Sequence, residues 1–90
     1  MIKEPIMIQN KLGLHTRAAA KLVATASKFE SKIELMQNDH IADCKSIMAI
    51  ILLGGTKGMT FDLVISGADE FQARDAIVDL INNCFGEVQT

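Results

Sequence analysis

The chain has 90 residues, of which 49% are hydrophobic and one is proline, so it can form one packed domain but not two independent cores. Its net charge of −2 and its lack of Trp and Tyr argue against non-specific nucleic-acid binding, which uses a basic face and aromatic side chains. No apolar run approaches the roughly 20 residues that span a bilayer, and the first residues lack a signal-peptide pattern. We expect a single domain over residues 1–90, cytoplasmic and without membrane insertion.

The cysteines and His40 carry no recognisable chemistry. Cys44 and Cys84 have no Cys-x-x-Cys or Cys/His spacing around them, so the pattern predicts reduced thiols and neither a metal site nor a redox pair. His40 lies beside an expected turn without a partner of ligand type, which is typical of a solvated histidine. We expect no metal and no cofactor.

The first third of the sequence predicts a strand, a loop and a helix. Residues 2–9 alternate imperfectly, and Pro5 restricts such a strand to a sheet edge because proline has no N–H to donate. Residues 10–13 form the loop. Residues 16–28 have apolar side chains at the spacing of an amphipathic helix: Ala19, Leu22, Val23, Ala26 and Phe29.

Three further strands and a last helix complete the core. Residues 32–37 alternate as in a half-buried strand, Asn38-Asp39 suits a tight turn, and residues 40–44 would return as a short strand. Residues 59–66 alternate most clearly, with the inward positions Phe61, Leu63 and Ile65. The last helix opens at Gly67 or Ala68, ends at Gly86, and has a buried stripe made of Ala73, Ile77, Leu80, Ile81 and Cys84.

Residues 47–53 are apolar nearly all round and lie between helix signals. Ser46 is a good N-cap, and the glycines after residue 53 favour a helix stop followed by a turn. A helix of this length cannot bury every side chain against one sheet, so some of Ile47, Met48 and Ile51 should be exposed. Such a patch suggests a docking surface, although a partly exposed and inert core helix remains the alternative.

The order β-α-β-β-α-β-α predicts an α+β fold. Three helices need an apolar surface that a four-stranded sheet can supply on one side. We therefore expect a two-layer open-faced α/β sandwich with the first strand at an edge of the sheet.

His15 stands where the first loop becomes a helix. The backbone amides of Thr16, Arg17 and Ala18 should lack intrahelical acceptors, and such a helix start attracts anions. The arginine in this first turn is misplaced against the helix dipole unless an anion is bound. An imidazole with an unperturbed pKa near 6.5 is an available nucleophile, so the motif suits acceptance of a phosphoryl group.

The local charge around His15 is positive. Lys11, Arg17 and Lys21 are nearby, and no Asp or Glu occurs between Glu4 and Glu30. A general acid/base enzyme would place a carboxylate or second titratable group within reach of its histidine. The pattern therefore favours transient holding of an anion, and the alternative is a histidine that merely begins a helix.

The motifs at residues 13–19, Gly-Leu-His-Thr-Arg-Ala-Ala, and at residues 45–48, Lys-Ser-Ile-Met, closely resemble the two signatures of the HPr family. These are the histidine-containing phosphocarriers of the bacterial phosphoenolpyruvate-dependent phosphotransferase system. The resemblance covers essentially the whole chain and implies an antiparallel sheet in the order 1-4-2-3. Many members have proline at the position of Ala18, so one more amide is available in the first turn here.

The resemblance also implies roles for individual residues. His15 would accept a phosphoryl group from phospho-enzyme I and pass it to a IIA-type protein, with Arg17 assisting and without turnover as an enzyme. Ser46 would match a regulatory serine that a kinase or phosphorylase modifies in some bacteria. The helix of residues 47–53 would dock both partners, and the helix starts at His15 and Ser46 would lie near each other.

Two other functions stay open. The chain could be a regulatory binding module in which Ser46 phosphorylation controls association and His15 is secondary, as in nitrogen-related or catabolite-control systems. It could also be a small hydrolase of phosphate esters or acyl phosphates, although no water-activating carboxylate is evident near His15 in the sequence. We expect a monomer.

Overall fold

The computed structural model describes residues 1–88 and has the expected order of strands and helices. Its four strands form one antiparallel sheet in the order β1-β4-β2-β3. The elements are β1 (Ile2–Met7), α1 (Thr16–Ala26), β2 (Lys32–Gln37), β3 (His40–Asp43), α2 (Ile47–Leu53), β4 (Thr60–Ser66) and α3 (Glu70–Asn82), and a 3₁₀ turn at Cys84–Gly86 follows. The predicted two-layer sandwich is confirmed.

Strand β1 lies at one edge of the sheet, as its proline requires. Pro5 is opposite Asp62 of β4, and β3 forms the other edge. The alternation of β4 places Phe61, Leu63 and Ile65 in the core, and all three are buried as predicted. Register is therefore set by apolar side chains on one face, because a slip of one residue would expose them all.

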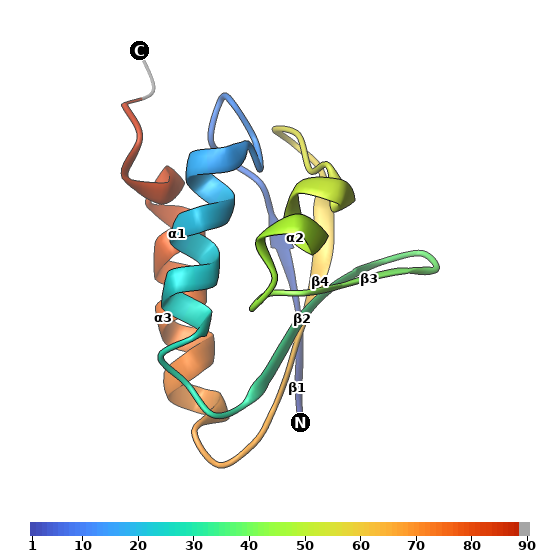
Figure 1. Ribbon diagram of the computed structural model, residues 1–90, viewed down its shortest axis with the longest axis vertical. Helices are drawn as coiled ribbons and strands as arrows, with labels where there is room; N and C mark the ends of the chain where they lie inside the picture. The colour runs from blue at the N-terminus through green and yellow to red at the C-terminus, as the bar shows by residue number, and fades with distance from the viewer. Residues whose placement is uncertain (89–90) are drawn as a thin grey trace.

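The helices cover one face of the sheet, and α1 and α3 lie side by side (Figure 1). Helix α1 buries Leu22 and three small side chains, which are Ala18, Ala19 and Ala26. Their size lets the helix approach the sheet closely. Within residues 1–88, no helix is long and apolar enough to cross a membrane.

Helix α1 ends at Ala26, two residues before the predicted end at Lys28. The amides of Lys28 and Phe29 donate to the carbonyls of Thr25 and Ala26, each at 3.2 Å. These bonds join residues three apart, so the chain tightens into a turn and leaves the helix.

Helix α3 begins at Glu70, later than the predicted start at Gly67 or Ala68. Gly67 has φ +155, which is incompatible with a helix. Asp69 precedes the helix, but its carboxylate accepts hydrogen bonds from Glu30 N (2.9 Å), Ser31 N (3.0 Å) and Ser31 Oγ. Asp69 therefore does not cap α3 with its side chain, and its hydrogen bonds instead stabilise the loop after α1.

The end of α3 also differs from the prediction. The helix stops at Asn82, and Cys84 and Phe85 follow with φ of +54 and +55, a left-handed conformation. Cys84 therefore belongs to a turn and is only partly buried, so its assignment to the helical stripe is wrong. Phe85 is buried in the core instead, and the chain that follows runs beside the start of α1 (Figure 1).

Helix α2 has the predicted bounds and caps. Ser46 Oγ accepts from Ala49 N at 3.2 Å, and Gly54 ends the helix with φ +69. Gly55 O then accepts from Leu14 N at 2.8 Å. A Cβ on Gly13 would lie 2.4 Å from that carbonyl oxygen, so the absence of a side chain lets the end of α2 contact the loop before His15.

Both cysteines are free thiols. Cys44 is buried, and its burial, together with the charges of Asp43 and Glu34, raises its pKa to about 12. A neutral thiol of this kind packs as a small apolar group.

Candidate functional site

His15 is the N-cap residue of α1, and its side chain makes no capping hydrogen bond. Its backbone is extended, with φ −76 and ψ 176, and its carbonyl accepts from Ala19 N at 2.8 Å. The amides of Thr16, Arg17 and Ala18 precede the first full helical bond and have no intrahelical acceptor. No acidic residue lies in this turn, so the helix start is arranged to attract an anion.

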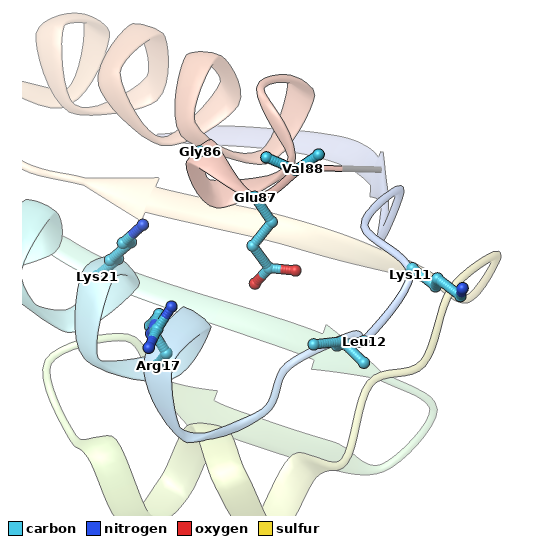
Figure 2. A pocket seen from close by; sticks show the side chains of 7 residues that line it. All are labelled: Lys11, Leu12, Arg17, Lys21, Gly86, Glu87 and Val88. Carbon is cyan, nitrogen blue, oxygen red and sulfur yellow. The ribbon is translucent and has the colours of Figure 1, made fainter. Parts of the chain in front are cut away.

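A pocket of about 470 Å³ opens beside this helix start. Figure 2 shows Arg17 and Lys21 projecting from α1 on one side and Leu12 and Lys11 on the preceding loop. Gly86, Glu87 and Val88 complete the wall from the end of the described chain. The pocket thus joins the first helix to the segment that follows α3.

Glu87 places a carboxylate directly on His15. Its Oε2 lies 2.5 Å from His15 Nε2, and the two side chains are 11% and 29% exposed. The expectation of no carboxylate near His15 is therefore wrong, because the two residues are 72 positions apart in the sequence and meet only through the fold. Among residues 1–88, no group of three or more His, Cys, Asp and Glu side chains is placed to hold a metal ion.

Asn10 holds the other oxygen of Glu87. It is fully buried, and its Nδ2 donates to Gly13 O at 2.7 Å and to Glu87 Oε1 at 3.1 Å. Partial burial disfavours the ionised form of Glu87, but the hydrogen bonds to His15 and Asn10 outweigh it and lower the pKa of Glu87 below its ordinary value. The carboxylate is charged at neutral pH.

The segment that carries Glu87 is anchored to α1 and to the core. Lys21 Nζ donates to Phe85 O at 2.6 Å, and the Phe85 ring is buried. Sequence reasoning missed Glu87 because no spacing relates it to the histidine motif. A usable signal was Phe-Gly-Glu after an amphipathic helix, since an apolar anchor and a glycine indicate a turn onto the core.

Ser46 is the N-cap residue of α2, and its neighbour Lys45 reaches the chain that follows α1. Lys45 Nζ donates to Phe29 O at 2.7 Å, past the C-terminus of α1. Gly55, just after the C-terminal end of α2, contacts the loop before His15. The implied proximity of the two helix starts stays a prediction.

Helix α2 exposes part of the predicted docking surface. Ile47 and Met48 are 42% and 63% exposed, whereas Ile51 packs partly against the core. Leu52, at 78%, and Leu12, at 66%, are exposed apolar residues that the sequence analysis did not select. Exposed apolar side chains therefore occur at both ends of α2 and in the loop before His15.

An open-faced sandwich with a partly exposed histidine at an open helix start, beside an arginine, has the features expected of a histidine phosphocarrier. A family model described as "PTS HPr component phosphorylation site" matches residues 2–83. The chain belongs to the HPr family of phosphocarriers, as its motifs indicated, and family membership implies interaction with enzyme I and IIA-type proteins.

Relatives of known sequence and structure support this assignment. The chain is 47% identical over 87 residues to the phosphocarrier protein HPr of Neisseria meningitidis serogroup B. The alignment covers 97% of this chain and 98% of that protein. HPr-C-His from Thermoanaerobacter tengcongensis has a similar crystal structure, with a TM-score of 0.93, 45% identity and coverage of 98% and 99%. A crystal structure of an HPr dimer from the same organism has a TM-score of 0.75 at 44% identity, with coverage of 97% and 100%.

Proposed function

We propose that His15 is the residue that carries the phosphoryl group and that Nδ1 is its nucleophilic atom. The observation that carries this proposal is the contact between Nε2 and Glu87. A neutral imidazole has one N–H, and a carboxylate partner favours that hydrogen on the nitrogen it contacts. Within residues 1–88 no hydrogen bond engages Nδ1, so its lone pair is available.

The transfer then needs one bond made and one broken. The Nδ1 lone pair of His15 attacks phosphorus, and the bond from phosphorus to the donor atom of enzyme I breaks with its electron pair left on the donor. In the transfer to a IIA-type protein, an acceptor atom of that protein bonds to phosphorus, the phosphorus–nitrogen bond breaks, and its electron pair returns to Nδ1. Arg17 and the amides of Thr16, Arg17 and Ala18 hold the phosphate oxygens between the two steps.

The same geometry opposes the hydrolase reading. A hydrolase needs a carboxylate or other base placed to activate water. Glu87 lies close to His15, but its two oxygens are engaged by His15 and Asn10. A phosphoryl group on His15 should therefore stay on the ring until a partner protein accepts it, because no base is placed to activate water against it.

Intact-mass measurement tests this function. The protein is incubated with phosphoenolpyruvate and enzyme I, and we expect one acid-labile phosphate addition. His15→Ala should abolish it, while His40→Ala, a change of the other histidine at the exposed start of β3, should leave it intact. Absence of the addition in the unchanged protein would refute the proposal, as would its survival in His15→Ala.

Helix α2 supplies the docking surface for enzyme I and IIA-type proteins in this proposal. The support is the exposure of Ile47 and Met48, which adjoin the partly buried Ile51. Met48→Asp should raise the Kd for enzyme I by placing a charge in an apolar contact. Phe71→Asp, at an exposed aromatic on α3, is the matched control and should leave the Kd unchanged.

A second function, regulation through Ser46, is favoured by the position of that residue at the start of α2. A phosphate on Ser46 would add about −1.5 to −2 charges beside Ile47 and Met48. A kinase or phosphorylase acting on Ser46 would thereby change partner choice. If Ser46→Ala abolished function in cells while His15→Ala did not, regulation would replace phosphoryl transfer as the main role.

The remaining expectations concern assembly and location. We propose a single cytoplasmic domain that acts as a monomer. Pro5 on the edge strand β1 disfavours strand pairing between copies. Sedimentation equilibrium should give one chain per particle, and a concentration-dependent dimer would contradict this.

A further inference from the structure

We propose that Glu87 is a positioning residue for phosphoryl transfer and that Asn10 aims it, so that the carboxylate keeps the proton on His15 Nε2 before and after the transfer. The inference rests on the proposed function of His15. Glu87 lies beyond residues 2–83, the stretch that the family model matches. It therefore adds a residue that the histidine motif does not contain.

The buried amide of Asn10 has a fixed orientation. Its Nδ2 donates to two acceptors, Gly13 O and Glu87 Oε1. Turning the amide over would bring Asn10 Oδ1 against these two oxygens and leave them without a donor. Since the residue is fully buried, water cannot compensate for the exchange. Asn10 therefore presents N–H to Glu87 and requires an acceptor there.

The positively charged residues around Glu87 favour the ionised carboxylate, which can pair with an imidazolium. Lys11, Arg17 and Lys21 line the same pocket, and Glu87 is the acidic residue among the lining side chains. Lys21 is held at Phe85 O, which fixes the segment and not the carboxylate. The ionised Glu87 is thus oriented by Asn10 on one oxygen and contacts His15 with the other.

This contact allows the transfer to proceed without moving a proton. When Nδ1 bonds to phosphorus, Nε2 keeps its hydrogen and the ring becomes an imidazolium. Its positive charge is then paired with the Glu87 carboxylate. When the phosphoryl group leaves, the electron pair of the phosphorus–nitrogen bond returns to Nδ1 and the ring is neutral again, still with Nε2–H.

Replacement of Glu87 by glutamine gives a sharp test because Asn10 dictates how the new amide must turn. The glutamine oxygen should stay on Asn10 Nδ2, which places the glutamine NH₂ on His15 Nε2. The imidazole hydrogen then moves to Nδ1 and blocks the nucleophile. We expect Glu87→Gln to slow phosphoryl uptake from phospho-enzyme I by about 10- to 100-fold, the range seen when the carboxylate partner of a metal-binding histidine is removed.

Two further variants separate positioning from a structural effect. Glu87→Ala lets the ring adopt either tautomer, so it should be slowed less than Glu87→Gln. Glu30→Gln makes the same change at an exposed site past the C-terminus of α1 and should behave as the unchanged protein. ¹⁵N NMR of the imidazole should place the hydrogen on Nε2 in the unchanged protein and on Nδ1 in Glu87→Gln.

The outcomes are distinguishable. Uptake in Glu87→Gln at the unchanged rate, or slow uptake with the hydrogen still on Nε2, would overturn the proposal and leave the carrier function of His15 standing. Equal slowing by Glu87→Ala and Glu87→Gln would overturn the role of Asn10. An unchanged protein that takes up no phosphate would overturn the proposed function and this inference with it.

Discussion

Helices α1 and α2 begin in opposite ways. At α1 the N-cap residue is His15, whose side chain makes no capping bond, and Arg17 lies in the first turn. At α2 the N-cap residue is Ser46, whose hydroxyl oxygen accepts from Ala49 N. One helix start is left open to an external anion, and the other is closed by its own side chain.

The difference separates stability from function within one small fold. A closed start contributes about 1 kcal/mol to folding. An open start with a cation in its first turn sacrifices about 0.3 to 1 kcal/mol, a cost that a bound phosphate removes. Changes at α1 should therefore act on phosphoryl transfer, and changes at α2 on stability and partner choice.

The largest effect is expected at Arg17. Arg17→Ala should slow phosphoryl uptake by about 10²- to 10³-fold, the loss typical when one donor to a developing oxyanion is removed. The same variant should be slightly more stable, by about 0.3 to 1 kcal/mol, because an unfavourable cation leaves the helix start. Stopped-flow transfer and urea unfolding measure the two effects.

Lys28→Ala removes an exposed cation past the other end of α1 and is the control for Arg17→Ala. It should alter neither quantity appreciably. If Arg17→Ala took up phosphate at the unchanged rate, the backbone amides of the helix start would be sufficient to hold the phosphoryl group, and the Arg17 side chain would have no role in the transfer.

The next effect is expected at the contact between the two helices. Gly13→Ala combines a left-handed backbone, at φ +69, with a Cβ only 2.4 Å from Gly55 O. It should cost about 1 to 3 kcal/mol for the backbone conformation and more for the displaced loop. Gly58→Ala, at φ +91 with nothing within 4 Å, isolates the conformational cost and should be milder in urea unfolding. Equal losses would mean that the contact with Gly55 is unimportant.

Ser46→Ala tests the closed start of α2. Loss of the hydroxyl should lower the free energy of unfolding by about 1 kcal/mol, with phosphoryl uptake at His15 unchanged. Thermal unfolding and the transfer assay measure the two properties. A loss of uptake comparable to that of Arg17→Ala would end the separation between the two helix starts.

The smallest effect is expected at the start of α3, where Asp69 serves the preceding loop. The hydrogen bonds from Ser31 and Glu30 lower the pKa of Asp69 below its ordinary value of 3.8. Its stabilising contribution is therefore complete above that value and is lost as the pH falls through the lowered pKa. Asp69→Asn should be less stable at pH 7, and the difference should shrink in acid unfolding. Asp79→Asn, at an exposed position on α3, should show no such trend.

Local patterns predicted most of the fold but did not predict the contact of Glu87 with His15. The period-2 alternation of β4, the caps of α2 and Pro5 each act within a few residues, so the sequence predicted their consequences correctly. Glu87 depends on a turn formed by two non-glycine residues with positive φ, Cys84 and Phe85. Such residues show no local preference for that conformation, and burial of the Phe85 ring, a tertiary effect, accompanies it here.

The contact between His15 and Glu87 has a consequence for folding. It joins residues 72 positions apart, so it closes a loop that contains β2, β3 and β4. The packing of the core must first offset the conformational entropy lost in closing that loop. A partly folded chain can form the helix that follows His15, but it cannot supply the carboxylate. The rate of phosphoryl uptake is thus a reporter of complete folding, which a spectroscopic signal from α1 is not.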